Sequence, residues 1–169
     1  LKKKNCRKIL LLPLFPQYSA VNAATIFDKV SKILSKWRWV PSLHFVNGYH
    51  DDLGYIHALS KSIENHKYYG TQDMIVFSYH GIPKKYFDKG DPYHCFCQKT
   101  SRLVAEKLGI DESQYITSFQ SRLAAAGREW LKPYTSELLQ DLPKKNIKKI
   151  LILSPGFSMD CLETIEEID

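Results

Sequence analysis

Two apolar runs, each followed by a short polar segment, constrain the fold of this 169-residue chain more than any other feature. Residues 74–79 read Met-Ile-Val-Phe-Ser-Tyr and lead directly into His80. Residues 150–153 read Ile-Leu-Ile-Leu and lead into a segment that contains Glu163. Short apolar runs of this kind predict buried β-strands. Because ligands in open α/β sheets bind just beyond the carboxyl ends of the strands, a histidine and a carboxylate are delivered to the expected site.

Helix patterns alternate with strand patterns along the chain, which predicts an α/β fold with parallel sheets covered by helices. The expected strands are residues 8–14, 43–46, 73–79, 114–119 and 148–153. The expected helices are residues 19–36 with Ser19 as the cap, a helix capped by Asp51 or Asp52, residues 95–108, residues 135–142, and a helix that begins near Ser158 or Asp160. We expect residues 81–93 to form a loop and residues 121–133 to be irregular or partly helical.

The order of these elements favours two lobes. Residues 1–70 would form a partial N-terminal lobe, and residues 71–169 a truncated C-terminal lobe that carries the candidate site. Because the chain begins without methionine and stops inside a helix pattern that has no stop signal, we expect a fragment. The basic start followed by residues 9–15 imitates a signal peptide, but the run is short and contains Pro13, which favours a buried strand.

Charge and cysteine content narrow the classes of function. The net charge of +6 is spread over the chain rather than gathered in one stripe, which argues against a nucleic-acid partner. A basic face could equally meet anionic lipid or an acidic small molecule. The four cysteines are expected to be free thiols or ligands, and the segment 94–97, His-Cys-Phe-Cys, cannot place three side chains on one helix face, so we expect packing residues there. Neither a glycine-rich nucleotide loop nor a nucleophile elbow is present in the sequence.

His80 is the first candidate for chemistry. Gly81 and Pro83 restrict the backbone beside it, which leaves the imidazole free to point into a cleft. An imidazole can take up a proton near neutral pH, or bind a metal such as iron, zinc or manganese. A loop histidine that only hydrogen-bonds a turn explains the sequence equally well.

Glu163 is the second candidate. Asp160 and Glu163 have the spacing of a capping box, so both carboxylates could simply satisfy a helix N-terminus. Glu163 and Glu167 are four residues apart and share a helix face, with Glu166 close by, which indicates either a solvated surface, the usual case, or a line of cation ligands. Because Glu163 and His80 both follow strand ends, parallel neighbours would bring them to a common cleft.

Six segments follow one another in a distinctive order. They are residues 12–19 (Leu-Pro-Leu-Phe-Pro-Gln-Tyr-Ser), 78–83 (Ser-Tyr-His-Gly-Ile-Pro), 90–93 (Gly-Asp-Pro-Tyr, with Cys95 and Thr100 after it), 119–122 (Phe-Gln-Ser-Arg), 130–135 (Trp-Leu-Lys-Pro-Tyr-Thr) and 154–164 (Ser-Pro-Gly-Phe-Ser-Met-Asp-Cys-Leu-Glu-Thr). In order and spacing they resemble the ferrochelatase family, and the resemblance covers nearly the whole chain.

The resemblance implies a chelatase-like fold of two Rossmann-like lobes, each with a four-stranded parallel sheet flanked by helices, and a porphyrin cleft between them. It implies that His80 and Glu163 are catalytic, and that these two residues and Glu167 meet the metal. It places Phe15 and Trp130 in the porphyrin pocket. Which of His80 and Glu163 takes the pyrrole protons is left open.

The function implied by the resemblance is insertion of ferrous iron into protoporphyrin IX to form protohaem, a lyase reaction of haem biosynthesis. A coproporphyrin ferrochelatase and a non-catalytic metal or haem binder of the same fold are the alternatives. Ferrous iron and the porphyrin would be substrates, and the location would be cytoplasmic, with peripheral contact to the inner membrane. An iron–sulfur cluster, the oligomeric state and the activity of the fragment itself are left open.

Overall fold

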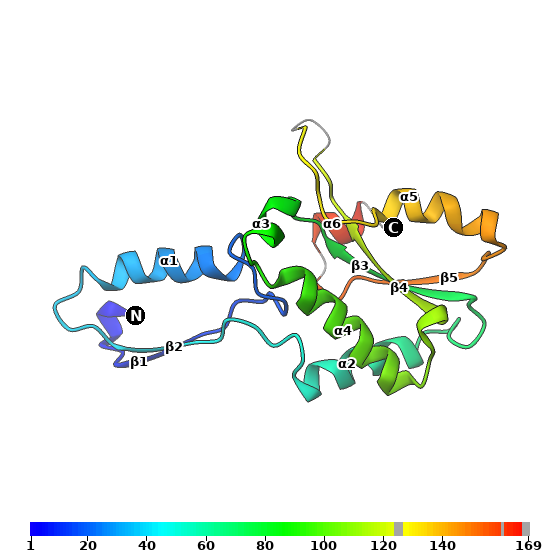
Figure 1. The fold of residues 1–169 in the computed structure, drawn as a ribbon. Helices are drawn as coiled ribbons and strands as arrows, with labels where there is room; N and C mark the ends of the chain where they lie inside the picture. Colours follow the sequence, from blue (N-terminus) through cyan, green and yellow to red (C-terminus); the bar gives the residue numbers. More distant parts are fainter. Residues whose placement is uncertain (124–126, 160, 167–169) are drawn as a thin grey trace.

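An arm projects from a larger body in the computed structural model, which describes residues 1–123, 127–159 and 161–166 (Figure 1). The arm contains β1 (Lys8–Leu11), α1 (Ala23–Leu34) and β2 (Ser42–Phe45). The two strands pair in parallel, with Lys8 opposite Ser42, and α1 runs beside them. A short 3-10 helix, η1 (Lys2–Lys4), precedes β1.

The body is a second parallel sheet with helices on both faces. Its strands are β3 (Met74–His80), β4 (Tyr115–Gln120) and β5 (Ile150–Leu153), in the order β4-β3-β5. Its helices are α2 (Leu53–Glu64), α4 (Tyr93–Leu108) and α5 (Thr135–Asp141), together with η2 (Glu112–Gln114) and η4 (Leu142–Lys145). Figure 1 shows α2 and α4 on one face of the sheet and α5 on the other. The predicted α/β class with parallel sheets flanked by helices is confirmed.

Strand β3 lies at the centre of the sheet and divides the core into two layers. Side chains alternate between the faces of a strand. Accordingly Ile75 and Phe77 pack with the cluster that includes α2 and α4, while Met74 and Val76 pack against α5. Because β3 is buried on both sides, it reads as a continuous apolar run, which is typical of parallel sheets.

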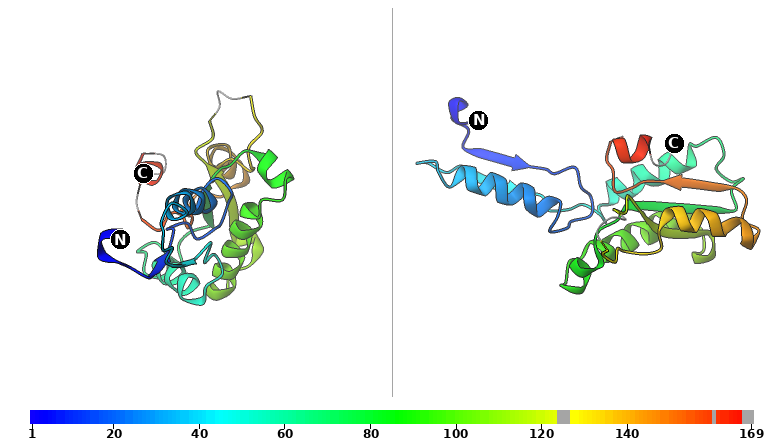
Figure 2. Two further views of the ribbon diagram at one scale, coloured as in Figure 1. Left: turned by 90° about the vertical axis from the view of Figure 1, so that its left-hand side faces the viewer. Right: turned by 90° about the horizontal axis from the view of Figure 1, so that it is seen from above.

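The body draws on residues from both sides of position 70. Ile56 and Ile63 of α2 belong to the same cluster as β3, and α2 packs against α4. The right-hand view of Figure 2 shows α2 and α4 with the body, away from the arm. The division into lobes at residues 1–70 and 71–169 stays a prediction. Where the resemblance implies four strands in each lobe, the described residues form sheets of two and three strands.

Several local details differ from expectation. The expected loop over residues 81–93 contains a short helix, α3 (Lys84–Asp88). Helix α1 is capped by Asn22 and not by Ser19, because residues 20–22 form a turn and the helix begins only at Ala23. The alternative of Asp52 as the cap of α2 is confirmed, since its carboxylate accepts the Tyr55 N–H at 3.0 Å.

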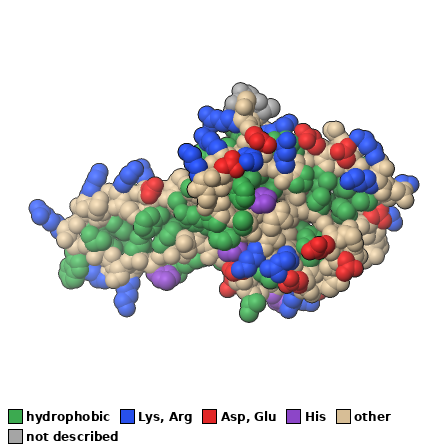
Figure 3. Space-filling view, in the orientation of Figure 1, with side chains coloured by type: hydrophobic (Ala, Val, Ile, Leu, Met, Phe, Trp, Pro, Cys, Tyr) green, Lys and Arg blue, Asp and Glu red, His purple; other side chains and the backbone are tan. Residues whose placement is uncertain are grey.

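The arm exposes much of its apolar surface. The expected strand over residues 8–14 is present, but the expectation that it is buried is wrong, since Leu10 is 67% exposed. The reason is that β1 pairs only with β2, so its sheet has two strands and one covering helix. Figure 3 shows apolar side chains along the arm. Among the described residues, no helix is both long and apolar enough to cross a bilayer.

Candidate active site

A cavity of about 770 Å³ opens where the arm meets the carboxyl ends of β3 and β5. Its walls come from the loop after β1, the start of α1, the segment after β3 and the segment after β5. His80, Glu163, Phe15 and Trp130 all line it. The structure therefore brings four of the five sequence-predicted site residues together at the sheet edge that the strand pattern indicates. The fifth, Glu167, lies outside the described residues.

His80 is the last residue of β3, and its ring is held by the main chain of the next residue, Gly81. Its Nδ1 lies 2.7 Å from the Gly81 carbonyl oxygen. A carbonyl oxygen can only accept, so Nδ1 carries the proton and Nε2 of the neutral ring keeps its lone pair. The Tyr93 hydroxyl donates to the His80 carbonyl at 2.9 Å, which ties the end of β3 to α4. These contacts leave Nε2 as the atom that can accept a proton or meet a cation.

Gly81 allows a close approach between β3 and β4. Its N–H donates to the Gln120 carbonyl at 2.8 Å, and a Cβ added to Gly81 would lie 2.9 Å from that oxygen. The same Cβ would lie 3.4 Å from the Trp130 ring. A larger residue would push the peptide that orients the His80 ring away from β4, so glycine is the residue that fits.

Glu163 lies in α6 (Leu162–Ile165), a short helix capped by Cys161. The Cys161 N–H donates to the Thr164 hydroxyl at 3.0 Å, so Thr164 occupies the reciprocal capping position that the sequence assigned to Glu163. The helix thus begins one residue later than the spacing of Asp160 and Glu163 predicts, and Asp160 lies outside the described residues. The Glu163 carboxylate accepts hydrogen bonds from the Cys161 side chain and from the main chain at the start of the helix, and it also lines the cavity.

The surroundings of Glu163 favour its ionised form. Hydrogen bonding from the Cys161 side chain is the largest of the causes that lower the pKa of Glu163, followed by a main-chain hydrogen bond and, more weakly, by the charge of His80. The influence of His80 is consistent with both side chains lining one cavity. A carboxylate that stays ionised at neutral pH can face a cation.

Phe15 and Trp130 contribute aromatic surface to the cavity. Phe15 is 39% exposed in the loop after β1, whereas Trp130 is only 7% exposed. Trp130 forms an isolated antiparallel bridge with Pro83 and so lies against the segment that follows His80. Its indole Nε1 is buried without an acceptor among the described residues.

Residues that join the arm to the body were missed as individual site residues, although they fall within the ordered segments. The Ser19 hydroxyl and the Ala20 N–H both donate to the same Asp91 oxygen at 2.8 Å. Gln17 is almost fully buried and donates to the Thr100 hydroxyl at 3.0 Å. A polar residue inside an otherwise apolar segment, as Gln17 is, was the available signal.

None of the residues 94–97 lines the 770 Å³ cavity. Cys95 is exposed and Cys97 is fully buried, and burial raises the pKa of the Cys97 thiol. His94 stacks against Phe119 with ring centroids 5.7 Å apart. Within the described part of the chain, no group of three His, Cys, Asp or Glu side chains is arranged to hold a metal ion.

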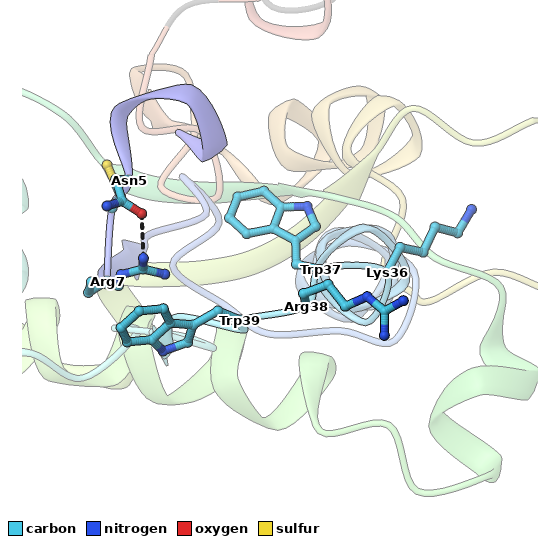
Figure 4. A pocket seen from close by; sticks show the side chains of 7 residues that line it. Asn5, Arg7, Lys36, Trp37, Arg38 and Trp39 are labelled. Carbon is cyan, nitrogen blue, oxygen red and sulfur yellow. Dashed lines mark hydrogen bonds between the residues drawn. The ribbon is translucent and has the colours of Figure 1, made fainter.

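A second cavity of about 300 Å³ lies in the arm, remote from His80. Figure 4 shows the side chains that line it, where the Arg7 guanidinium lies 3.3 Å from the centre of the Trp39 ring and donates to Asn5. Lys36 and Arg38 add positive charge. Neither a histidine nor a carboxylate lines this cavity, so it lacks the base and the anionic ligand that the first cavity combines.

The fold and the first cavity define an α/β protein with a cavity at the carboxyl edge of a parallel sheet and an imidazole and a carboxylate on the cavity wall. The ferrochelatase family model matches residues 1–169, and the chain belongs to the ferrochelatase family. It is 51% identical over 170 residues to a ferrochelatase of Hydrogenovibrio crunogenus and 51% identical over 170 residues to one of Marinobacter nauticus. All of this chain is covered in both comparisons, and it spans 44% and 45% of those two relatives.

Proposed function

We propose that this chain forms the metal-facing part of an enzyme that inserts ferrous iron into protoporphyrin IX to form protohaem. The observation that carries the proposal is the presence of His80 and Glu163 on one largely apolar cavity. Its volume, about 770 Å³, suits a flat organic ligand of porphyrin size. Membership of the ferrochelatase family supports the same reaction.

Proton removal is the first requirement of this reaction. A porphyrin that takes up a divalent ion gives up its two pyrrole protons, so the site needs a base that works near neutral pH. His80 fits that role, because its Nδ1 proton is engaged by Gly81 and its Nε2 is left to accept. Each proton taken up by the imidazole would pass to water before the next transfer.

Handling of the cation is the second requirement. Ferrous iron must lose bound water and still be released to the porphyrin nitrogens, which calls for ligands that hold it weakly. The ionised Glu163 carboxylate would offset the charge of the ion as it enters. Glu167 would continue the acidic row one turn further along, as the sequence predicts.

Binding of the macrocycle is the third requirement. Phe15 and Trp130 would cover part of its faces. Distortion of the flat ring, which exposes its nitrogens to an incoming ion, would draw on these contacts remote from the metal.

The direct test is an insertion assay with the polypeptide at its full natural length. Ferrous iron and protoporphyrin IX are supplied anaerobically, and haem formation is followed by absorbance. The proposal predicts turnover with protoporphyrin IX, and faster turnover with coproporphyrin III would identify the coproporphyrin enzyme instead. Tight porphyrin binding without turnover would contradict the proposal and favour a non-catalytic binder.

A cytoplasmic location with peripheral contact to the inner membrane is part of the same proposal. Leu14 and Phe15 line the cavity and are 51% and 39% exposed, so an apolar surface beside the cavity is available for such contact. Co-sedimentation with vesicles of inner-membrane lipids would test it. Membrane contact is supported if the wild type binds the vesicles and Leu14→Ser binds them more weakly. It is contradicted if the wild type does not bind them.

A further inference from the structure

We propose that Gln120 is a positioning residue that holds His80 and Glu163 in one fixed arrangement, an inference that rests on the function proposed above. Gln120 ends β4 and is 6% exposed. Its main chain and its side chain bind to different halves of the candidate site.

The main chain of Gln120 fixes the peptide that orients the histidine. Gln120 pairs with His80 in the parallel register of β3 and β4. Its carbonyl accepts the Gly81 N–H at 2.8 Å, and the Gly81 carbonyl in turn accepts the Nδ1 proton of His80 at 2.7 Å. The direction in which Nε2 points therefore depends on the position of the Gln120 backbone.

The side chain of Gln120 reaches the segment that carries the carboxylate. Its Nε2 donates to the Glu163 carbonyl at 2.8 Å, and its Oε1 accepts from the Ser78 hydroxyl at 2.7 Å. With the amide reversed, Oε1 would face the Glu163 carbonyl, and two acceptors would oppose each other. A single amide thus links β3, β4 and α6 in one orientation.

A chain of buried hydroxyls follows from that orientation. Ser78 has one hydroxyl proton and gives it to Gln120, so it must accept from Thr135 at 2.8 Å. Thr135 has then used its own proton and must accept from Ser118 at 2.9 Å. All three hydroxyl residues are buried, and hydrogen bonds aligned in one direction strengthen one another. The Glu163 carbonyl can only accept, so it sets the direction of the amide and of the whole chain.

Helix α6 depends on this anchor because it has little packing of its own. It spans four residues, none of which is buried. Leu162 and Ile165 are 74% and 53% exposed, so the described residues do not cover the apolar side chains of the helix. The hydrogen bond from the buried Gln120 side chain to the Glu163 carbonyl is therefore a principal restraint on the position of Glu163.

The experiment uses the polypeptide at its full natural length with the variants Gln120→Leu and Gln120→Glu. Leucine removes both side-chain hydrogen bonds, while Gln98→Leu, on the exposed surface of α4, is the matched control. Glutamate keeps an acceptor for Ser78 but loses the donor to Glu163 until it is protonated, and burial raises the pKa of such a carboxyl. Hydrogen exchange of residues 161–166 and steady-state kinetics are measured from pH 6 to pH 8.

We expect Gln120→Leu to speed exchange at residues 161–166 by about tenfold or more and to lower kcat by about tenfold with KM nearly unchanged, while Gln98→Leu changes neither. For Gln120→Glu we compare its kcat with the wild-type kcat at the same pH. We expect this ratio to be at least about threefold higher at pH 6 than at pH 8, because the protonated carboxyl regains a donor. The same ratio for Gln120→Leu should not vary with pH, so a general loss of structure would not reproduce the pattern.

Unchanged exchange at residues 161–166 in Gln120→Leu would overturn the anchoring role whatever the activity. Faster exchange with an unaltered kcat in an active enzyme would overturn the positioning role. If the wild type itself inserts no iron, the proposed function fails, and the exchange data for the three variants still decide whether Gln120 anchors α6.

Discussion

The Tyr93 hydroxyl donates a hydrogen bond to the main-chain carbonyl of His80 at 2.9 Å, and so connects the first turn of α4 to the last residue of β3. Tyr93 is buried at the wall of the cavity, so this bond is shielded from water. It complements the bond from Nδ1 to Gly81, and together the two fix both the backbone and the ring of His80.

Removal of the Tyr93 hydroxyl should therefore loosen His80. We expect Tyr93→Phe to lower the free energy of unfolding by about 1 kcal/mol, the usual net value of a buried hydrogen bond. Chemical denaturation measures this, with Tyr68→Phe as a control, because Tyr68 is 57% exposed. A loss for Tyr93→Phe no larger than for Tyr68→Phe would contradict the expectation.

Asp91 should be the main polar link between the arm and the body. One of its oxygens accepts from both Ser19 and Ala20, and the other accepts the Tyr93 N–H at 3.0 Å. In Asp91→Asn one oxygen becomes an amide that cannot accept, so we expect a loss of about 1–3 kcal/mol in unfolding free energy. Denaturation of the variant measures the loss.

Asp88→Asn is the matched control for Asp91. The Asp88 carboxylate forms an exposed ion pair with Lys84, which should contribute less than about 1 kcal/mol to the unfolding free energy. Equal effects of the two substitutions would show that Asp91 does not join the arm to the body.

Gly81 should tolerate no side chain. The Cβ of Gly81→Ala would lie 2.9 Å from the Gln120 carbonyl, which forces β3 and β4 apart where the His80 ring is oriented. We expect a loss of about 1–3 kcal/mol in unfolding free energy, together with slower iron insertion. Gly54→Ala, in the first turn of α2, is the control: its Cβ would lie 3.1 Å from a side-chain oxygen of Asp52 rather than against backbone, so it should change stability by less than about 1 kcal/mol. Normal insertion by Gly81→Ala would contradict the need for this close approach.

His50 should make stability depend on pH. Its ring stacks on Phe96 with the ring centroids 3.7 Å apart, and its buried Nε2 has no hydrogen-bond partner among the described residues, although Asp51 lies 3.8 Å away. Burial lowers its pKa below the ordinary 6.5. Asp51 raises this pKa and Lys99 lowers it, both less than burial does. The fold thus prefers the neutral ring, and the stability from this preference is complete above pH 6.5 and falls as the pH drops below that value.

Unfolding free energies at several pH values test the role of His50. We expect His50→Phe, which keeps an aromatic ring against Phe96 and cannot titrate, to flatten the decline between pH 7 and pH 5. The same substitution at His57, on the exposed side of α2, should leave the decline as it is. An unchanged slope in His50→Phe would contradict the assignment.

Much of the fold could be predicted from the sequence, because its signals are local and strong. The apolar run of β3, the Asp52 cap and the glycine that ends α4 in a left-handed conformation all act within a few residues. The cap of α1 could not be predicted, because the helix begins only at Ala23, after a turn that follows Ser19. Ser19 before that turn and Ala20 within it donate to Asp91, 72 and 71 residues away in sequence, and such long-range contacts leave no trace in local spacing.

In the candidate site, too, some features could be predicted from the sequence and others could not. The position of His80 at the end of a strand could be predicted from periodicity, because parallel strands present their carboxyl ends at one edge. The contribution of Gln120 could not, since a glutamine at the end of a strand gives no sign of which backbone it will reach. The start of α6 lies one residue later than the spacing of Asp160 and Glu163 predicts, because Cys161 and Thr164 form the reciprocal capping pair.

The most direct test of the account is the rate of ferrous iron insertion into protoporphyrin IX by His80→Ala and Glu163→Gln, in the polypeptide at its full natural length. Matched controls are His57→Ala and Glu112→Gln, two exposed residues of the same types that do not line the cavity. The account predicts that kcat falls by about 100-fold or more in each site variant, the scale of a lost acid–base group, and stays near the wild-type value in both controls. Turnover within about twofold of the wild type in either site variant would contradict the assignment of that residue to the reaction.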